Sequence, residues 1–207
     1  MRPLPAPLSY HLDLYRYWDA KRWGRSMPAR KDLSPSEVPV LLPHLTLIDV
    51  IDGRFRYRLV GSKVVQDLGR EMTGTWVGTH VTPPAYAAAL CSIYEQVCSG
   101  RRPIFTTGEY RSPSKLMHAV SRLLVPLSED GESVNMILLS RVSRYDRQGS
   151  AANWLGRTAG AVGDTTVAAS AEDVITLCLD WERQCAAKEV PPYAVVATGG
   201  ELVAAAN

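Results

Sequence analysis

The chain has 207 residues, of which 46% are hydrophobic and 21% are charged, and its formal net charge is +2. This composition is typical of a globular protein that buries a core, and so small a net charge does not favour a nucleic-acid partner. The first ten residues contain three prolines and no apolar stretch of signal-peptide length. No apolar run approaches the roughly 18 residues that cross a bilayer. We therefore expect a cytoplasmic protein that binds neither nucleic acid nor membrane.

The first predicted element is an amphipathic helix over residues 9–23. Leu8, Leu12 and Tyr15 recur at helical spacing and would form its apolar stripe. Gly24 and a nearby proline end the pattern. A helix with one apolar stripe must bury it, so this segment is expected either to cover the domain's sheet or to meet a second subunit.

A second, shorter helix is predicted after residue 34. Ser34 is a suitable N-cap, Pro35 suits the first helical position, and Glu37 completes a capping box three residues after the cap. Pro43 would end this helix. The expected result is one or two turns that lead into the first strand.

A β-hairpin follows, with strands over residues 46–51 and 54–60 joined by Asp52-Gly53. Alternation gives the second strand one apolar and one basic face, formed respectively by Phe55, Tyr57, Leu59 and by Arg54, Arg56, Arg58. The arginines could grip a phosphorylated nucleotide. The alternative is a solvated face or ion pairs with Asp and Glu.

Two helices come next, a short one after Gly61 that Gly69 closes and a longer one over residues 83–99. Three strands complete the domain, over residues 103–111, 115–127 and 133–142. The last two strands are apolar on both faces, interrupted only by His118, Arg122, Asn135 and Arg141. A strand buried on both sides needs a layer over each face of its sheet. The helices between the strands would form one layer, and the N-terminal helix or a second subunit the other.

The composition changes after Tyr145, where a stretch rich in Gly, Ala, Ser and Thr begins. An amphipathic pattern returns before the end of the chain and predicts a last helix, which could fold back, support a dimer or dock a partner. The expected organisation is an N-terminal helix and lead-in (1–30), a domain (31–145), a flexible linker (146–169), a C-terminal helix (170–187) and a tail (188–207).

The cysteines form two pairs, each seven residues apart, at Cys91, Cys98, Cys178 and Cys185. Zinc sites use spacings of two to four residues. Seven residues of helix rise about 10 Å, which is too far for a disulfide. The expected role is that of small buried hydrophobic side chains, so we predict no metal site.

The order of elements, and several short motifs at fixed spacing, resemble a family of bacterial proteins that consist of little more than one PAS domain. The most distinctive motifs are Met27-Pro28-Ala29-Arg30, Asp32-Leu33-Ser34-Pro35, Leu42-Pro43 and Arg58-Leu59-Val60-Gly61, and the resemblance covers roughly residues 15–142. It implies an α+β fold with a five-stranded antiparallel sheet, helices on one face and the N-terminal helix on the other. It also implies that residues 55–74 are one wall of a small ligand pocket.

No motif in the sequence predicts catalysis: the nucleophile elbow, the zinc-protease helix and the phosphate-binding glycine loops are all missing. We therefore expect a protein that is not an enzyme. A cone-shaped α+β isomerase or dehydratase is the alternative, although such an enzyme needs a buried Asp or His that faces a deep cavity.

The resemblance also bears on cofactors. Light-sensing relatives carry a reactive cysteine in an Asn-Cys-Arg-Phe motif, which this sequence lacks. Haem-binding relatives usually place a histidine on the long helix, and residues 83–99 contain none. His80 and His118 keep a haem sensor open as an alternative, but no cofactor is predicted.

The function that this reasoning favours is a sensory or regulatory PAS protein in signal transduction. The candidate ligand-binding side chains are Tyr57, Trp76, Tyr86 and His118, each with simple core or surface packing as its alternative. No output domain is recognisable in the sequence, so the signal would pass through protein contact. We expect a homodimer, and a signalling protein as the further partner.

Overall fold

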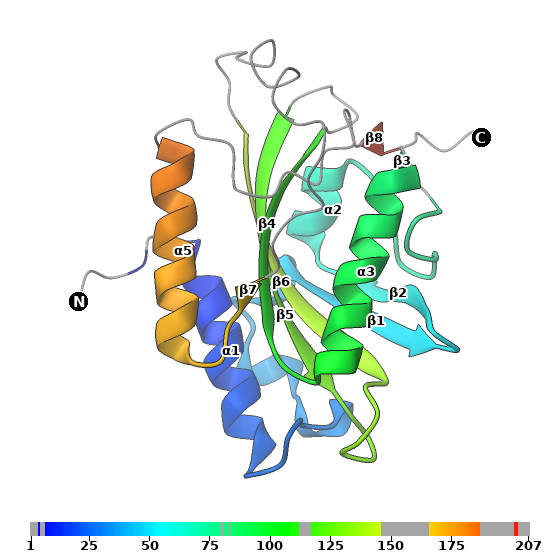
Figure 1. The fold of residues 1–207 in the computed structure, drawn as a ribbon, viewed down its shortest axis with the longest axis vertical. Coiled ribbons are helices and arrows are strands. Elements are labelled where there is room, and N and C mark those ends of the chain that lie inside the picture. The colour runs from blue at the N-terminus through cyan, green and yellow to red at the C-terminus, as the bar shows by residue number, and fades with distance from the viewer. Residues whose placement is uncertain are drawn as a thin grey trace.

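The structure, a computed structural model, describes residues 4, 7–79, 81–82, 84–111, 117–145, 166–186 and 201–202. The helices are α1 (Ser9–Arg22), α2 (Ser62–Leu68), α3 (Pro84–Gly100) and α5 (Ala171–Ala186), and the 3₁₀ turns are η1 (Arg30–Asp32), η2 (Pro35–Glu37) and η3 (Leu42–His44). The strands are β1 (Leu45–Ile51), β2 (Arg54–Val60), β3 (Val81–Thr82), β4 (Ile104–Arg111), β5 (Met117–Leu127), β6 (Met136–Tyr145), β7 (Thr166–Val167) and β8 (Glu201–Leu202). Figure 1 shows their arrangement.

The centre of the fold is an antiparallel sheet in the order β2-β1-β6-β5-β4. The two-residue strands extend it at the β4 edge, where β7 pairs antiparallel with β4 and β8 touches β4 through one parallel pair. The predicted five-stranded antiparallel sheet of an α+β fold is therefore confirmed.

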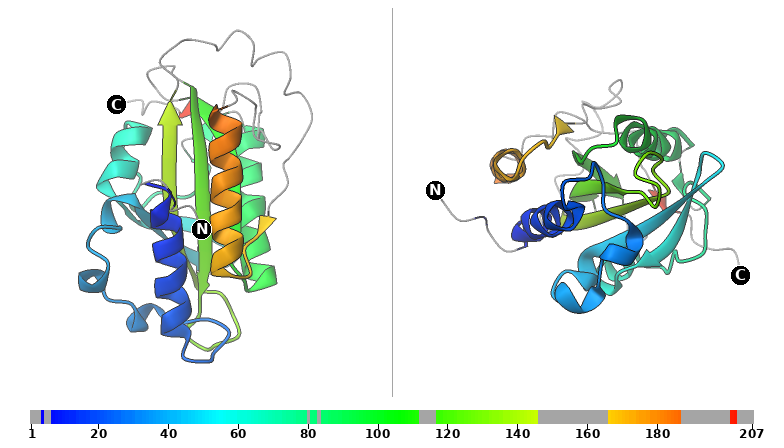
Figure 2. Two further views of the ribbon diagram at one scale, coloured as in Figure 1. Left: turned by 90° about the vertical axis from the view of Figure 1, so that its left-hand side faces the viewer. Right: turned by 90° about the horizontal axis from the view of Figure 1, so that it is seen from below.

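Helices cover both faces of this sheet. Figures 1 and 2 show α1 and α5 side by side on one face, and α3 on the opposite face with α2. We call these the α1 face and the α3 face. Each has its own apolar core, one containing Leu14, Trp18 and Trp181, the other containing Ile48, Val97 and Ile137. The prediction that the N-terminal helix covers the second face is confirmed, and α5 shares that face with it.

Polar contacts near both of its ends hold the C-terminal helix α5 against the α1 face. The Tyr15 hydroxyl on α1 donates a 2.7 Å hydrogen bond to the Ala169 carbonyl, just before α5 begins. Further along, Arg144 of β6 forms a 2.6 Å ion pair with Glu182. Trp181 is only 1% exposed, so the helix folds back and buries its apolar stripe within the chain.

The predicted linker and tail lie largely outside the described residues. Of the linker, residues 146–165 are not described, while Thr166–Val167 form β7. Of the tail, Glu201–Leu202 form β8. The division of the chain into five segments therefore stays a prediction.

The predicted alternation of β2 is wrong at one position. Phe55 and Tyr57 are buried, but Leu59 is 49% exposed and Val60 is buried instead. The cause is an irregularity in the β1–β2 ladder, since Leu47 pairs with Leu59 whereas the next residue of β1 pairs with Tyr57. A bulge inserts one extra residue and reverses the alternation beyond it.

The predicted helix after Ser34 is also wrong, because η2 is a single 3₁₀ turn whose Ser34 side chain makes no capping hydrogen bond. Glu37, the expected partner in the capping box, bonds to α1 instead. Its carboxylate pairs with Lys21 at 2.7 Å and accepts a hydrogen bond from the Tyr17 hydroxyl at 2.7 Å. Glu37 therefore contacts two side chains of α1 and does not take part in a capping box with Ser34.

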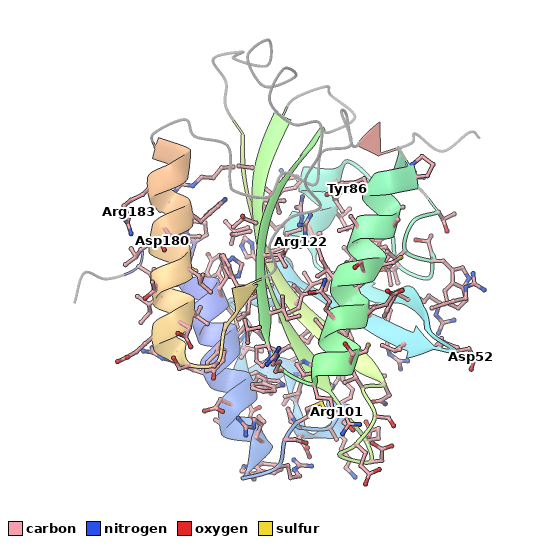
Figure 3. All side chains as sticks on the ribbon, in the orientation of Figure 1. Asp52, Tyr86, Arg101, Arg122, Asp180 and Arg183 are labelled. Carbon is pink, nitrogen blue, oxygen red and sulfur yellow. The ribbon has the colours of Figure 1, made fainter. Side chains whose placement is uncertain are left out.

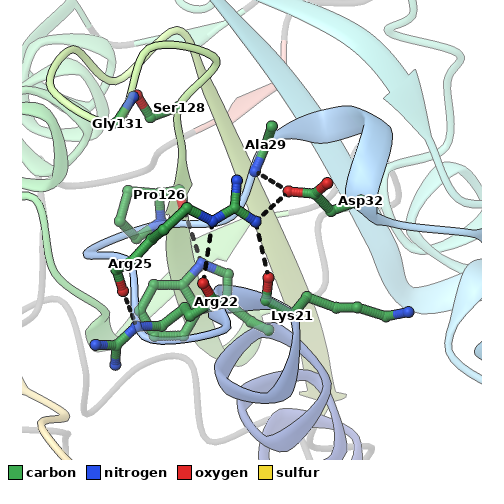
Figure 4. A network of polar contacts seen from close by, with 9 residues as sticks. Lys21, Arg22, Arg25, Ala29, Asp32, Pro126, Ser128 and Gly131 are labelled. Carbon is green, nitrogen blue, oxygen red and sulfur yellow. Dashed lines mark hydrogen bonds and ion pairs between the residues drawn. The ribbon is translucent and has the colours of Figure 1, made fainter.

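The segment that connects α1 to β1 is held by polar contacts, which Figure 4 shows. The Asp32 carboxylate accepts a hydrogen bond from the Ala29 amide at 2.8 Å and pairs with Arg25 at 2.5 Å. Nearby, the Trp18 indole donates to the Pro126 carbonyl at 2.7 Å. The motif residues Ala29 and Asp32 thus fix the path of the chain from α1 back to the sheet.

Gly61 ends β2 where two stretches of backbone cross closely. A Cβ atom on Gly61 would lie 2.4 Å from the carbonyl oxygens of both Leu42 and Pro43. Real side chains do not tolerate such distances to backbone atoms, so only glycine fits. This close approach explains why the strand–turn–helix of β2 and α2 has a glycine at its corner.

Candidate functional site

Polar side chains cross the α3 face of the sheet in one row. Thr106 of β4 pairs with Arg122 of β5, and Arg122 pairs with Arg141 of β6. Directly opposed residues on neighbouring strands point to the same face. The three residues are 1%, 8% and 5% exposed, respectively. Two arginines are therefore buried side by side on neighbouring strands of the sheet.

Three buried tyrosines meet this row from β2 and α3. Arg122 donates a 3.1 Å hydrogen bond to the Tyr86 hydroxyl oxygen, and Figure 3 shows the two residues between α3 and the strands. Tyr57 and Tyr94 share a side-chain hydrogen bond. We call the set Thr106, Arg122, Arg141, Tyr57, Tyr86 and Tyr94 the polar cluster.

The electrostatics of the polar cluster keep its tyrosines protonated. Burial raises the pKa of Tyr57 to about 12, although Arg122 lowers it. Burial also raises the pKa of Tyr94 well above its usual value. The shared hydrogen bond lowers the pKa of Tyr57 and raises that of Tyr94. At neutral pH these phenols are therefore O–H donors.

One carboxylate borders the polar cluster. Asp67 of α2 lies 3.5 Å from Arg141 and 3.1 Å from Lys63. Its side chain is 15% exposed, against 5% for Arg141 and 45% for Lys63. Asp67 thus stands between a buried cation and a surface cation.

A second polar group lies directly behind the polar row, on the α1 face. The buried ring of His11 bonds to the Ser140 hydroxyl at 2.7 Å and to the Ser121 hydroxyl at 2.8 Å. Burial lowers the pKa of His11 to about 3, so its ring is neutral. Ser121 and Ser140 precede Arg122 and Arg141 in the chain, so the same two strands carry both groups.

The structure brings together two of the four candidate ligand-binding residues. Tyr57 and Tyr86 belong to the polar cluster, and each is less than 10% exposed. Trp76 lies at the outer side of β2, where the Arg54 guanidinium sits 4.0 Å from its ring centroid. His118 lies on β5 opposite Tyr145, and its side chain is outside the described residues.

Sequence reasoning missed Arg122, Arg141 and Tyr94 as site residues. The signal for the arginines was present, because charges rarely interrupt a strand that is apolar on both faces. Tyr94 gave no such signal, since it falls within the buried stripe of α3 and would be assigned to ordinary core.

The basic residues of β2 do not join the polar cluster. Arg56 and Arg58 pair with the Asp49 carboxylate at 2.9 and 3.4 Å. Asp49 lies on β1 opposite Arg56. Of the two interpretations drawn from the sequence, ion pairing therefore accounts for these arginines.

The side chains of three cysteines are described, of which Cys178 is buried and Cys91 and Cys98 are partly buried. Cys178 is fully buried, and burial raises its pKa to about 12. Burial likewise raises the pKa of Cys98 to about 11, which suppresses the reactive thiolate. Among the described residues, no three His, Cys, Asp or Glu side chains gather as metal ligands would.

Within the part of the chain that the structure describes, no helix has the length and apolar character needed to pass through a bilayer.

An open groove of about 440 Å³ runs between α1 and the start of α5, and its lining includes Arg16, Asp19 and Arg22. Asp19 and Arg22 pair with one another at 2.9 Å, so the groove is a mixed-charge surface.

Comparison with solved structures finds LOV and PAS domain proteins at low sequence identity. The Rhodobacter sphaeroides LOV protein is 15% identical, with 74% of this chain and 90% of that chain covered and a TM-score of 0.43. A single-residue variant of RsLOV is 18% identical, with 74% and 96% covered and a TM-score of 0.47. A PAS domain of an HTR-like protein from Haloarcula marismortui is 18% identical, with 54% and 96% covered and a TM-score of 0.35.

Comparison of the sequence with family profiles identifies the family of this chain. No curated protein matches this sequence. The profile of a family described as "PAS domain" matches residues 9–139, a span that begins with α1 and ends within β6. Since this span is well over half of the 207 residues, the chain belongs to the PAS domain family.

Proposed function

We propose that this protein is a cytoplasmic sensory or regulatory PAS protein without a catalytic output of its own. A small molecule binds at the polar cluster on the α3 face and changes how the sheet packs against α1 and α5. Another protein, either a second copy of the chain or a signalling partner, responds to that change. Membership of the PAS family supports the sensory role, and the buried polar cluster supports the place of binding.

The observation that carries this proposal is the position of two polar groups on opposite sides of the same two strands. Arg122 and Arg141 face α3, while the preceding residues, Ser121 and Ser140, both bond to His11 of α1. Successive residues of a strand point to opposite faces. A ligand that moves the two arginines therefore moves the two serines and changes the hydrogen bonds that hold α1.

A ligand can shift this packing only by as much as its affinities for the two arrangements differ. The α1 layer offers a suitable equilibrium, because α1 is held by the two specific His11 hydrogen bonds as well as by apolar burial. Loss of either bond would leave a buried serine or imidazole without its partner, which costs about 1–3 kcal/mol. Small strand movements would thus have a large effect on α1.

The proposal is tested by native mass spectrometry together with hydrogen exchange. Freshly purified protein is compared with protein that has been unfolded, dialysed and refolded. We expect a retained small molecule whose removal speeds or slows amide exchange in α1, while exchange at the Asp52-Gly53 turn stays constant. Unchanged exchange in α1 on removal of a bound molecule would count against the proposal.

The predicted homodimer is tested separately by size-exclusion chromatography with light scattering. The expected result is a mass of twice 22.7 kDa at micromolar concentration. A monomer under those conditions would leave a signalling protein, rather than a second copy, as the partner that responds.

A further inference from the structure

Three large apolar side chains are exposed near the end of β2, the edge strand of the sheet. Leu59 is 49% exposed, Leu42 of η3 is 37% exposed, and Val40, two residues before Leu42, is 68% exposed. The two segments cross at Gly61, where a Cβ atom would lie 2.4 Å from the Leu42 carbonyl oxygen. Apolar side chains from separate segments therefore gather at one part of the surface. We call Val40, Leu42 and Leu59 the β2-edge surface.

The exposure of Leu59 is a consequence of the bulge in the β1–β2 ladder. Regular alternation would place Leu59 with Phe55 and Tyr57, which are buried in the core of the α3 face. Beyond the bulge, Leu59 instead lies opposite Leu47, a core residue of the α1 face, and directly opposed residues point to the same side. Bulges next to functional sites often re-aim a side chain. Here the bulge turns a leucine outwards at a position that alternation would have buried.

The charged side chains around the end of β2 present their basic members to solvent. Arg56, Arg58 and Lys63 have side chains that are 41%, 54% and 45% exposed. The carboxylates with which they pair, Asp49 and Asp67, are only 7% and 15% exposed. Each ion pair thus has its anion beneath and its cation outermost, so a partner meets a positive surface. A second copy is disfavoured, because a two-fold interface brings the same patch, and here the same charge, against itself.

Asp67 connects this surface with the polar cluster. Its carboxylate lies 3.1 Å from Lys63 and 3.5 Å from Arg141, a member of the cluster. A partner carboxylate that engages Lys63 competes with Asp67 for that cation and so alters the environment of Arg141. Binding at the surface and binding in the cluster are therefore coupled, and such coupling is reciprocal.

We propose that the β2-edge surface, with Arg58 and Lys63 beside it, docks an acidic amphipathic segment of another protein. Apolar side chains of that segment pack on Leu42 and Leu59, while its carboxylates meet the two cations. Exposed ion pairs add little affinity by themselves, so apolar burial holds the partner and the charges select it. The inference rests on the proposed function only in identifying this partner as the signalling protein that responds to the ligand.

Fluorescence anisotropy tests the inference with two labelled synthetic peptides of equal length. Both form amphipathic helices with leucine on one face, which is a common mode of peptide recognition. One peptide carries glutamate beside the leucines, and the other carries lysine at the same positions. We expect the full chain to bind the acidic peptide at least about tenfold more tightly than the basic one. Added sodium chloride should weaken binding of the acidic peptide, because salt screens exposed charges.

Variants assign the binding to the β2-edge surface. Leu59→Ser is expected to weaken binding of the acidic peptide by about tenfold, and Arg58→Gln by a few-fold with a smaller dependence on salt. Trp23→Ser is the matched control for the leucine, since Trp23 is 67% exposed at the end of α1. Arg54→Gln is the control for the arginine, since Arg54 stacks on the Trp76 ring. Both controls should bind as the wild type does.

The outcomes separate this inference from the proposed function. If the acidic peptide binds no better than the basic one, or if Leu59→Ser and Leu42→Ser both bind it as tightly as the wild type, the docking surface is wrong. If light scattering shows that Leu59→Ser converts a dimer into a monomer, a second copy is the occupant and the acidic partner is wrong. If peptide binding fails while removal of a retained molecule alters exchange in α1, the sensory role stands without this surface. If the peptide binds and both leucine variants weaken it, but exchange in α1 does not change, the surface stands and the sensory role is wrong.

Discussion

The two faces of the sheet carry buried polar groups of opposite kinds. On the α1 face, the one buried imidazole described there has a partner at each ring nitrogen, Ser140 and Ser121. On the α3 face, Arg122 bonds to Tyr86, and the buried Thr106 hydroxyl of the same cluster has no hydrogen-bond partner among the described residues. Strands β5 and β6 contribute to both groups, so the difference does not come from different elements.

This contrast separates polar groups that hold the fold from those suited to a ligand. A buried network whose members satisfy one another specifies a structure and gains nothing from a further molecule. A buried polar group that has no partner among the described residues, such as the Thr106 hydroxyl, is stabilised when a partner arrives. The α1 face should therefore respond to mutation mainly through stability, and the α3 face mainly through binding.

The largest expected effect concerns the packing of the α1 face. Trp18→Ala removes a side chain that is 2% exposed and deletes its hydrogen bond to Pro126. We expect a loss of about 3–5 kcal/mol in the free energy of unfolding, measured by urea denaturation. Trp23→Ala is the control, because Trp23 is 67% exposed, and it should change stability by less than about 0.5 kcal/mol. Equal effects of the two variants would contradict the packing described for α1.

The next effect concerns the corner between β2 and α2, which supports the α3 face. Gly61→Ala would place Cβ 2.4 Å from two carbonyl oxygens of the backbone, so we expect destabilisation by about 3 kcal/mol, the upper part of the range for overpacking. Gly100→Ala is the control, since its Cβ would meet only the flexible Arg102 side chain at 3.4 Å. The measurement is again urea denaturation, and a Gly61→Ala variant as stable as the control would refute the close approach.

The His11 network makes a prediction about pH. The pKa of His11 is about 3 in the folded protein and 6.5 in the unfolded chain. As pH falls below 6.5, the unfolded chain therefore takes up the proton first. The stability that His11 contributes is complete above pH 6.5 and is lost as pH falls towards 3. Between pH 7 and pH 5 the free energy of unfolding should fall by about 2 kcal/mol from this group.

Variants of the two histidines sharpen this test. His11→Gln keeps a polar side chain but removes the titration, so its stability should lack this fall between pH 7 and pH 5. Burial also lowers the pKa of His44, which therefore adds a dependence of the same sign. His44→Gln should retain the part due to His11. If the stability of His11→Gln had the same pH dependence as that of the wild type, the prediction that His11 is buried as a neutral imidazole would be wrong.

Much of the fold could be predicted because its signals are local. Asp52-Gly53 predicted the hairpin, and the two residues adopt φ angles of 48° and 72°, as a tight primed turn requires. Helical periodicity likewise predicted α1, α3 and α5. The bulge in the β1–β2 ladder had no such signal, because the sequence of β2 alternates regularly through Arg58 and Leu59.

The site was harder to predict because it depends on register. Arg122 and Arg141 were recognisable as charges within apolar strands, but their meeting depends on how β5 and β6 align. A shift of one residue would have placed them on opposite faces. Trp76 was predicted as one of the side chains that converge on a ligand cavity, but its bridge to Arg56 and its contact with Arg54 place it at the outer side of β2, away from the polar cluster.

The smallest expected effect concerns two partly exposed arginines of β2. Arg56 and Arg58 both pair with Asp49, and their side chains are 41% and 54% exposed while that of Asp49 is 7% exposed. Each single change to alanine should cost only about 0.5 kcal/mol, because the other arginine still meets the carboxylate. The double variant leaves a nearly buried carboxylate without either cation, so its cost should exceed the sum of the single costs by about 1 kcal/mol. Urea denaturation of the four proteins in the cycle measures this excess, and additive single costs would show that the two arginines act on Asp49 independently rather than replacing one another.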